Sequence, residues 1–236
     1  MNIVILSGCE LENSRTAQTA RKIEECLLKV CPDASIRQFD QRNVKARHCI
    51  GCNECFYKGK CSLAKNDGME DLKEALLQSD MLFIISPVYF HQVSGTMKVF
   101  IDRLSYWTHL MRLVGKIAVT VSVSSNNGND YVNFYLNKFM TALGTIVLSN
   151  ISLLMDEDTP YEAEQKIMCG IEETFRKIRS NDLKVNQNQE ILFSVMGKKY
   201  KNAAEGVEYE FWHDNNYLEY ATFQALWNDH YVPVNI

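Results

Sequence analysis

The segment MLFIISPVYFHQVSG, residues 81–95, indicates the fold of this chain more clearly than any other stretch. It begins with a short apolar run, MLFIIS, which is typical of a strand buried on both faces of a parallel sheet. We expect Pro87 to end this strand. The residues after it then lie at the carboxyl end of a strand, which is where open α/β sheets bind their ligands.

Four similar apolar runs alternate with amphipathic helical segments. This alternation predicts βα units that build a parallel sheet. We therefore expect an α/β fold: a flavodoxin-like, doubly wound, five-stranded parallel sheet of order 2-1-3-4-5, with a cysteine-rich insertion loop and a C-terminal extension. The expected strands are residues 2–6, 34–39, 81–86, 116–123 and 145–153, and the expected helices are residues 14–30, 69–77, 93–106, 131–143 and 162–178.

The chain divides into two regions by composition. Residues 1–180 carry the strand and helix pattern, with the cysteine loop at residues 47–66. Residues 181–236 lose this regular pattern but are rich in Trp, Tyr and Phe, which argues against disorder. We expect this C-terminal extension to be ordered and to act as a lid over the ligand or as a dimer arm.

Composition excludes several classes of protein. The 236 residues have a net charge of −4, which gives no basic surface for nucleic acid. No apolar run is long enough to span a membrane, and the N-terminus lacks the basic region of a signal peptide. We therefore expect a cytoplasmic protein without nucleic-acid or membrane partners, in which eight cysteines serve metal or redox chemistry rather than a disulfide framework.

Four of these cysteines form one motif, HCIGCNECFYKGKC, in which Cys49, Cys52, Cys55 and Cys61 follow the spacing Cys-x2-Cys-x2-Cys-x5-Cys. Clustered spacing of this kind is typical of iron–sulfur ligands. A structural zinc site more often separates two Cys-x-x-Cys pairs by a longer arm. Zinc, free thiols and paired thiols remain alternatives.

The loop after the first strand is a candidate phosphate site. Its backbone amides, its hydroxyl groups and the positive end of the following helix can surround one phosphate. Asn13 and Ser14 could instead simply cap the helix. The candidate residues are Ser7, Cys9, Asn13, Ser14, Arg15 and Thr16.

Two further loops follow the third and fourth strands at the same edge of the sheet. The second loop carries aromatic side chains that can flank a flat ring, or that could merely plug the end of the sheet. The third loop has small, turn-forming residues and could be an ordinary connection. Because all three loops meet in this topology, they predict a mononucleotide pocket. The candidates are Pro87, Val88, Tyr89, Phe90 and His91 in the second loop, and Ser124, Asn127 and Gly128 in the third.

The segment SPVYFHQVSGTMKVFIDRL, residues 86–104, resembles the signature segment of the NADPH-dependent FMN reductase and flavodoxin-like family. The segment CIGCNECFYKGKC, followed by NDGM, resembles the iron–sulfur flavoprotein branch of that family. The resemblance implies FMN held by the three loops, a [4Fe–4S] cluster held by positions matching Cys49, Cys52, Cys55 and Cys61, and a homodimer or homotetramer. Cys9, Leu11 and Arg15 depart from the family's phosphate-loop pattern.

We therefore predict an FMN-dependent oxidoreductase or electron-transfer iron–sulfur flavoprotein that receives electrons from NAD(P)H or ferredoxin. One alternative is a cluster-free NAD(P)H:FMN or quinone reductase, in which the four cysteines bind zinc or nothing. A second is a non-catalytic redox sensor or partner-binding module. The sequence identifies no catalytic side chain.

Overall fold

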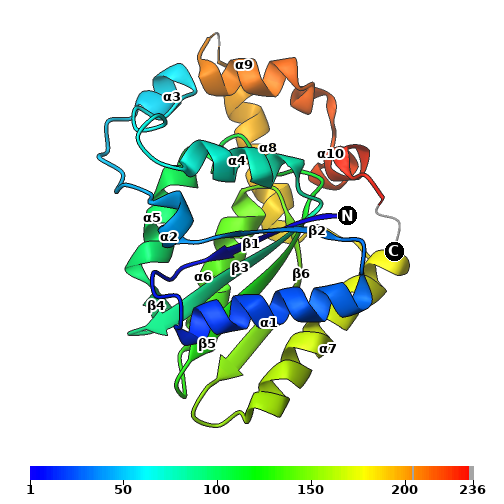
Figure 1. Ribbon diagram of the computed structural model, residues 1–236. Helices are drawn as coiled ribbons and strands as arrows, with labels where there is room; N and C mark the ends of the chain where they lie inside the picture. The colour runs from blue at the N-terminus through cyan, green and yellow to red at the C-terminus, as the bar shows by residue number, and fades with distance from the viewer. Residues whose placement is uncertain (204, 234–236) are drawn as a thin grey trace.

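The computed structural model describes residues 1–203 and 205–233, and a parallel sheet forms its centre (Figure 1). The strand order β2-β1-β3-β5-β6 confirms the predicted 2-1-3-4-5 order, because β5 and β6 are the predicted fourth and fifth strands. The short strand β4 pairs antiparallel with β3 and lies outside this path. The strands are β1 (Asn2–Ser7), β2 (Ser35–Phe39), β3 (Met81–Tyr89), β4 (Gln92–Val93), β5 (Ile117–Ser124) and β6 (Ile146–Leu154).

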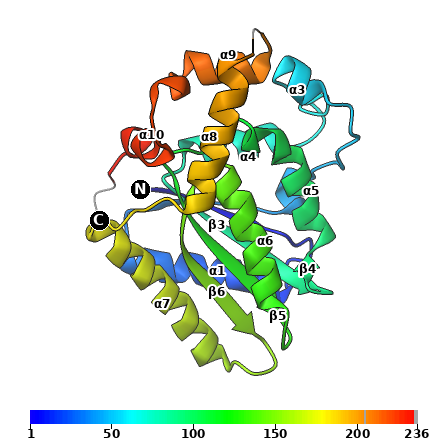
Figure 2. The ribbon, with the colours of Figure 1, turned by 180° about the vertical axis from the view of Figure 1, so that it is seen from behind.

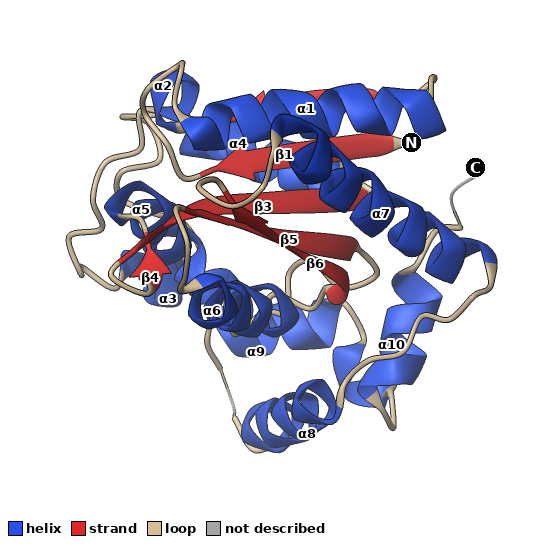
Figure 3. Ribbon diagram, turned by 90° about the horizontal axis from the view of Figure 1, so that it is seen from below, coloured by secondary structure: helices blue, strands red, loops and turns tan. Residues whose placement is uncertain are grey.

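Helices cover both faces of the sheet (Figures 2 and 3). Successive side chains of a strand point to opposite faces, so Ile3 and Ile5 of β1 join one apolar cluster and Val4 and Leu6 join the other. The first cluster includes buried residues of α1 (Arg15–Val30) and α7 (Pro160–Arg179). The second includes residues of α4 (Met69–Gln78), α5 (Gly95–Leu104) and α6 (Asn129–Ala142).

The prediction that Pro87 ends the third strand is wrong, because β3 continues to Tyr89. Pro87 pairs with Val123 of β5, whereas β1 ends at Ser7, opposite Ile85. At Pro87 the strand therefore has a neighbour on one side only. Proline is tolerated at such an edge position, because its missing N–H removes no ladder hydrogen bond.

The C-terminal extension is helical, which the sequence pattern did not indicate. Its aromatic side chains Trp212, Tyr217, Phe223 and Trp227 are buried in the same apolar cluster as the α1 face of the sheet. The strand arrowheads point away from these helices (Figures 1 and 2). The extension contains α8 (Gln187–Lys201), α9 (Val207–Asp214), the 3-10 turn η2 (Tyr217–Glu219) and α10 (Phe223–His230).

Two short helical segments were also absent from the predicted set, and a third lies partly within the predicted helix at residues 93–106. Two lie between β2 and α4, and the third follows α5 directly. Within the described residues, no helix combines the length and the apolar character needed to cross a bilayer. The short segments are α2 (Gln41–Val44), α3 (Glu54–Lys58) and η1 (Ser105–Thr108).

We expect Trp212→Ala to lower the free energy of unfolding by about 3–5 kcal/mol. Trp212 is fully buried, and its Nε1 donates to the carbonyl oxygen of His109 at 2.9 Å. Urea denaturation followed by circular dichroism measures the change. Tyr161→Ala is the control, because Tyr161 is 71% exposed, and it should change the value by less than about 0.5 kcal/mol. Equal losses in both variants would contradict this role of Trp212.

Candidate functional site

A cavity of about 470 Å³ lies at the carboxyl edge of the sheet, where the loops after β1 and β3 meet. Of the predicted site residues, Cys9, Ser14, Thr16, Pro87 and Tyr89 line it. The sequence analysis did not select the remaining lining residues. They are Gly8, Glu10, Leu11, Gln41, His48, Ser94, Gly95, Thr96 and Val99.

Ser94 joins the first two loops. Its hydroxyl donates to the carbonyl oxygen of Gly8 at 2.7 Å and accepts from the amide of Met97 at 3.0 Å. A Cβ atom on Gly8 would lie 2.6 Å from the Cβ of Met97, so only glycine permits this close approach. Ser94 therefore caps α5 and fixes the floor of the cavity at the same time.

The first loop leaves free donors beside the cavity. The first amides of a helix have no acceptor within it, and in α1 only the amide of Ala17 receives a side-chain cap, from Ser14 Oγ at 3.1 Å. The amides of Arg15 and Thr16 therefore remain available to an anion. Burial raises the pKa of the Cys9 thiol, which keeps this side chain neutral beside such an anion.

The other predicted residues of the first loop lie outside the cavity lining. Ser7 is buried at the end of β1, and Asn13 is exposed. Arg15 is also exposed and pairs with Asp156, with Nη1 and Oδ1 3.1 Å apart. The amide of Asp156 donates to the carbonyl oxygen of Ser125, so this ion pair links the first loop to the third.

The second loop is a tight hairpin turn with strained geometry. Phe90 and His91 connect β3 to β4, and both have left-handed backbone angles, with φ of 49° and 61°. Two-residue hairpins of this kind strongly favour Asn-Gly, because side chains disfavour positive φ. Backbone strain of this kind clusters at functional sites. Phe90 is fully solvent-exposed and Tyr89 is 64% exposed, so the turn presents aromatic surface to the solvent.

The third loop packs against this turn. The Nε2 of His91 lies 3.1 Å from Oδ1 of Asn127, and the His91 ring stacks on Tyr131 with centroids 5.1 Å apart. Gly128 has a φ of 84°, and a Cβ atom there would lie 2.8 Å from both His91 and Val88. The hydroxyl of Ser124, in contrast, is buried and donates to Asn129 at 2.5 Å. The structure therefore brings all three predicted loops together.

The four cysteines of the predicted metal motif lie on one loop between β2 and α4. Cys49 and Cys52 are exposed, and Cys55 and Cys61 are half-buried. Burial raises the pKa of Cys55, and the charges of Cys61 and Cys49 act in the same direction. Among the described residues, however, no three His, Cys, Asp or Glu side chains are arranged closely enough to hold a metal ion.

A buried ion pair closes this loop at its base. The side chains of Asp67 and Arg103 are both fully buried and are joined by two hydrogen bonds, the second of them 3.2 Å from Nη2 to Oδ1. The amide of Arg47 donates to Asp67 at 2.9 Å, and its carbonyl oxygen accepts from Arg103 at 2.9 Å. Asp67 and Arg103 therefore hold both ends of the loop together.

The tip of the cysteine loop contacts the C-terminal extension. The ring of Phe56 lies 5.1 Å from the ring of His109. The Nδ1 of His109 lies 2.6 Å from Oε1 of Glu208, which belongs to α9. Glu208 also accepts from Lys199 and Tyr200 of α8. No described residue of the extension lines the 470 Å³ cavity, and its proposed roles as lid or dimer arm remain predictions.

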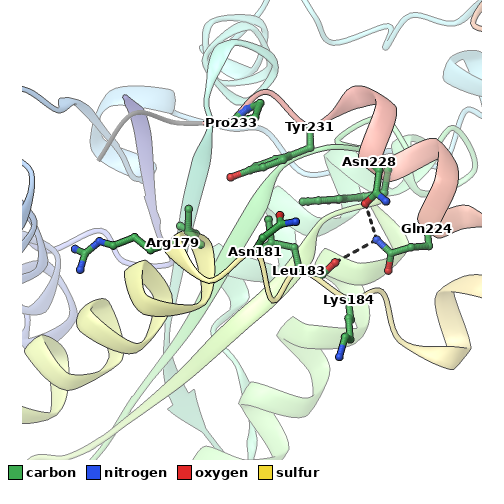
Figure 4. A pocket seen from close by; sticks show the side chains of 10 residues that line it. Arg179, Asn181, Leu183, Lys184, Gln224, Asn228, Tyr231 and Pro233 are labelled. Atoms are coloured by element: carbon green, nitrogen blue, oxygen red, sulfur yellow. Dashed lines mark hydrogen bonds between the residues drawn. The ribbon is translucent and has the colours of Figure 1, made fainter.

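A larger cavity, of about 1030 Å³, lies between the end of α7 and α10 (Figure 4). Arg179, Asn181 and Tyr231 line it, and Gln224 crosses its edge, donating to Leu183 and Asn228. None of its lining residues comes from the loops at the carboxyl edge of the sheet. The smaller cavity is therefore the candidate ligand site, because ligands of open α/β sheets bind at that edge.

Comparison with known proteins identifies the class. The profile of the NADPH-dependent FMN reductase family matches residues 1–160, and the chain belongs to this family. This confirms the predicted family and supports FMN-dependent oxidoreduction.

Individual similar proteins are consistent with this family. An iron-sulfur flavoprotein of Archaeoglobus fulgidus is 29% identical over 185 residues, which cover 74% of this chain and 81% of that protein. An iron-sulfur flavoprotein of Clostridioides difficile is 28% identical over 65% of this chain and 67% of its own length. The crystal structure of an apo NADH:FMN oxidoreductase shares the fold, with a TM-score of 0.56 and 19% identity over 80% of this chain and 92% of that one.

We expect Phe90→Asn to raise the free energy of unfolding of the flavin-free protein by about 1 kcal/mol. Asparagine tolerates the left-handed backbone, and the fully exposed Phe90 ring buries no surface that would be lost. The same variant should bind FMN more weakly if this ring contacts the flavin.

Urea denaturation and fluorescence titration with FMN measure the two effects. Phe134→Asn, which removes a 73% exposed aromatic ring from α6, should weaken neither property strongly. A Phe90→Asn variant with unchanged FMN affinity would show that the ring does not touch the flavin.

Proposed function

We propose that the 470 Å³ cavity binds FMN and that the protein uses this flavin to oxidise a nicotinamide nucleotide or an electron-carrier protein. One observation carries this proposal: in a chain of the FMN reductase family, the loops after β1 and β3 line one cavity that lies beside the free amides at the start of α1 and includes the exposed ring of Tyr89. A mononucleotide needs this combination of a phosphate site and a surface for a flat ring.

Each part of the cavity has a role in this proposal. The amides of Arg15 and Thr16 and the Thr16 hydroxyl bind the phosphate at the positive end of α1. Tyr89, which lines the cavity, flanks the ring, and the exposed Phe90 next to it covers the ring from the solvent side once FMN is bound. When bound, FMN accepts electrons from a donor and passes them to an acceptor, while the protein orients it and limits competing reactions.

The surface beside the cavity favours an acidic protein as a second donor. Residues 41–66 contain six Lys and Arg but only one acidic residue, whereas the whole chain carries a net charge of −4. A local charge of this kind steers oppositely charged partners toward the surface. Ferredoxin fits this description, and NAD(P)H fits the family. The six basic residues, all exposed, are Arg42, Lys45, Arg47, Lys58, Lys60 and Lys65.

We expect the FMN-loaded protein to be reduced by NADPH or by reduced ferredoxin in anaerobic stopped-flow experiments. Steered reduction by ferredoxin should slow as salt rises, because salt screens exposed charges. A protein that binds no FMN, or whose bound FMN neither donor reduces, would overturn the proposed function.

The variant Thr16→Val tests the phosphate site within the same experiments. It should bind FMN about 10-fold more weakly, since hydrogen bonds to charged groups contribute about 1.5–3 kcal/mol, but it should bind riboflavin unchanged. Thr19→Val is the matched control, because the Thr19 hydroxyl donates to Arg15 within α1 and does not line the cavity.

We further propose that Cys49, Cys52, Cys55 and Cys61 hold a [4Fe–4S] cluster. The donor set fits in its chemistry: four thiols stand on one loop, and thiolates are the usual ligands of iron–sulfur clusters. The loop must draw these sulfurs closer before they can share a metal. The names of the iron-sulfur flavoprotein relatives support this proposal, and a zinc site or free thiols remain the alternatives.

Anaerobic reconstitution with ferrous iron and sulfide tests the cluster. The wild-type chain should take up about four iron atoms per protomer, and Cys61→Ser should lose most of this iron while keeping FMN. Cys169→Ser is the control, since Cys169 is an exposed thiol on α7, outside the loop. Zinc uptake without iron would favour the zinc alternative.

A further inference from the structure

A third cavity, of about 460 Å³, lies between the cysteine loop and the C-terminal extension. Its walls come from α4, from the end of α3, from η1 with the turn after it, and from α9. The helices α3 and α9 lie side by side (Figures 1 and 2), and a Cβ atom on Gly59 would lie 3.1 Å from Val207. No described residue lines both this cavity and the proposed flavin cavity, so the two are separate.

Arg112 supplies unused hydrogen-bond donors to the 460 Å³ cavity. Its side chain is half-buried, and its guanidinium carbon lies 4.8 Å from the centroid of the Phe211 ring. A guanidinium carries five N–H donors in a fixed plane. Within residues 1–203 and 205–233, none of these donors has an acceptor and no carboxylate forms an ion pair with Arg112. The stack on Phe211 therefore orients a charged group that has no partner.

Lys73 adds a buried ammonium to the same cavity. Its side chain is only 6% exposed, and its Nζ donates to Oε1 of Glu70 at 2.7 Å. The Nζ also lies 5.5 Å from the centroid of the Tyr106 ring. An ammonium has three donors, so this one hydrogen bond leaves two of them without an acceptor among the described residues. Lysine is seldom buried so deeply.

The other walls of the cavity are largely apolar and aromatic. The rings of Tyr106 and Trp107 meet edge to face, with centroids 6.3 Å apart, and Phe211 lines the cavity from α9. The two acidic lining residues, Glu70 and Glu74, are exposed, so solvent and salt screen their charges. Apolar walls that carry a few oriented polar groups are typical of small-molecule sites.

We propose that this cavity binds a small aromatic carboxylate, with Arg112 as the hydrogen-bond donor and Lys73 as a second positive charge. A guanidinium matches the planar geometry of a carboxylate and bonds to both of its oxygens. The ring of the ligand packs against the aromatic walls. Because these walls belong to the cysteine loop, α4 and α9, a bound ligand ties the extension to the sheet domain.

Two probes with the same ring system test the site. Naphthalene-2-carboxylate carries the negative charge, and naphthalene-2-carboxamide is its neutral counterpart. In isothermal titration calorimetry the wild-type chain should bind the carboxylate about 10-fold more tightly than the amide, because hydrogen bonds to charged groups are the stronger ones. The carboxylate should also raise the melting temperature, since a ligand of the native state stabilises that state.

Two variants locate the binding. Arg112→Gln and Lys73→Met should each weaken the binding of the carboxylate about 10-fold and change the binding of the amide little. Lys73→Met keeps an unbranched apolar chain at a buried position, and it provides the result if Arg112→Gln does not fold. The matched control is Arg37→Gln, because Arg37 lies 4.9 Å from the centroid of Phe39 but is paired with Asp71 and lies outside this cavity.

The outcomes are distinct. Weaker carboxylate binding in both cavity variants, with wild-type binding in the control, would support the site. A wild-type chain that binds neither probe at millimolar concentration, or binds both equally, would overturn it. Carboxylate binding that survives either cavity substitution would also overturn it. None of these variants changes a residue of the proposed FMN or metal site, so this proposal and the proposed function can fail separately.

Discussion

The ion pair between Asp67 and Arg103 is the constraint on which the arrangement of the site depends. Burying either charge alone would be costly, and breaking a buried pair typically costs about 3–5 kcal/mol. Burial by itself raises the pKa of Asp67, but hydrogen bonds from Arg103 and from the amides of Arg47 and Met69 outweigh it and lower this pKa. Because Arg103 lies on α5 and Asp67 precedes α4, one interaction fixes the cysteine loop to both helices.

The same clamp relates the cavity to the cysteines. His48 lines the cavity and directly follows Arg47, which the pair holds in place, and Cys49 comes next in the chain. The first sulfur of the motif is thus tied to the wall of the proposed flavin site by a single backbone step. Ser94 provides a second restraint on the cavity lining through its hydrogen bond to Gly8.

Most of the fold could be predicted because its strands are short apolar runs separated by amphipathic helices. The end of β3 could not, because Pro87 is tolerated only where β1 has already stopped, and strand lengths are not visible in a local pattern. The helices of the extension were not predicted because their local sequence pattern does not show a regular apolar face. In α8 the buried Phe193 stands between the exposed Ile191 and Val195, which hides the periodicity of a buried face.

Topology alone predicted that the three loops would meet, and it could also have indicated Gln41 and His48, which follow β2 at the same edge. His48 directly precedes the cysteine motif, and the motif does not indicate that this side chain lines the cavity. Asp67 and Arg103 lie in two segments that carry the family resemblance, but they are 36 positions apart, and nothing in either segment indicates that their side chains pair. The spacing of the cysteines indicates a ligand set but does not reveal which side chains support it.

The contact between the cysteine loop and α9 has a consequence for biosynthesis. The ring of Phe56 lies against the ring of His109, and His109 in turn contacts Glu208, so the tip of the loop packs against a segment far along the chain from the loop itself. During translation the four thiols emerge long before this partner does, and contacts between distant segments form slowly. The Asp67–Arg103 pair can therefore close the base of the loop as soon as α5 has been made, whereas the tip of the loop gains its support only after α9 has been made.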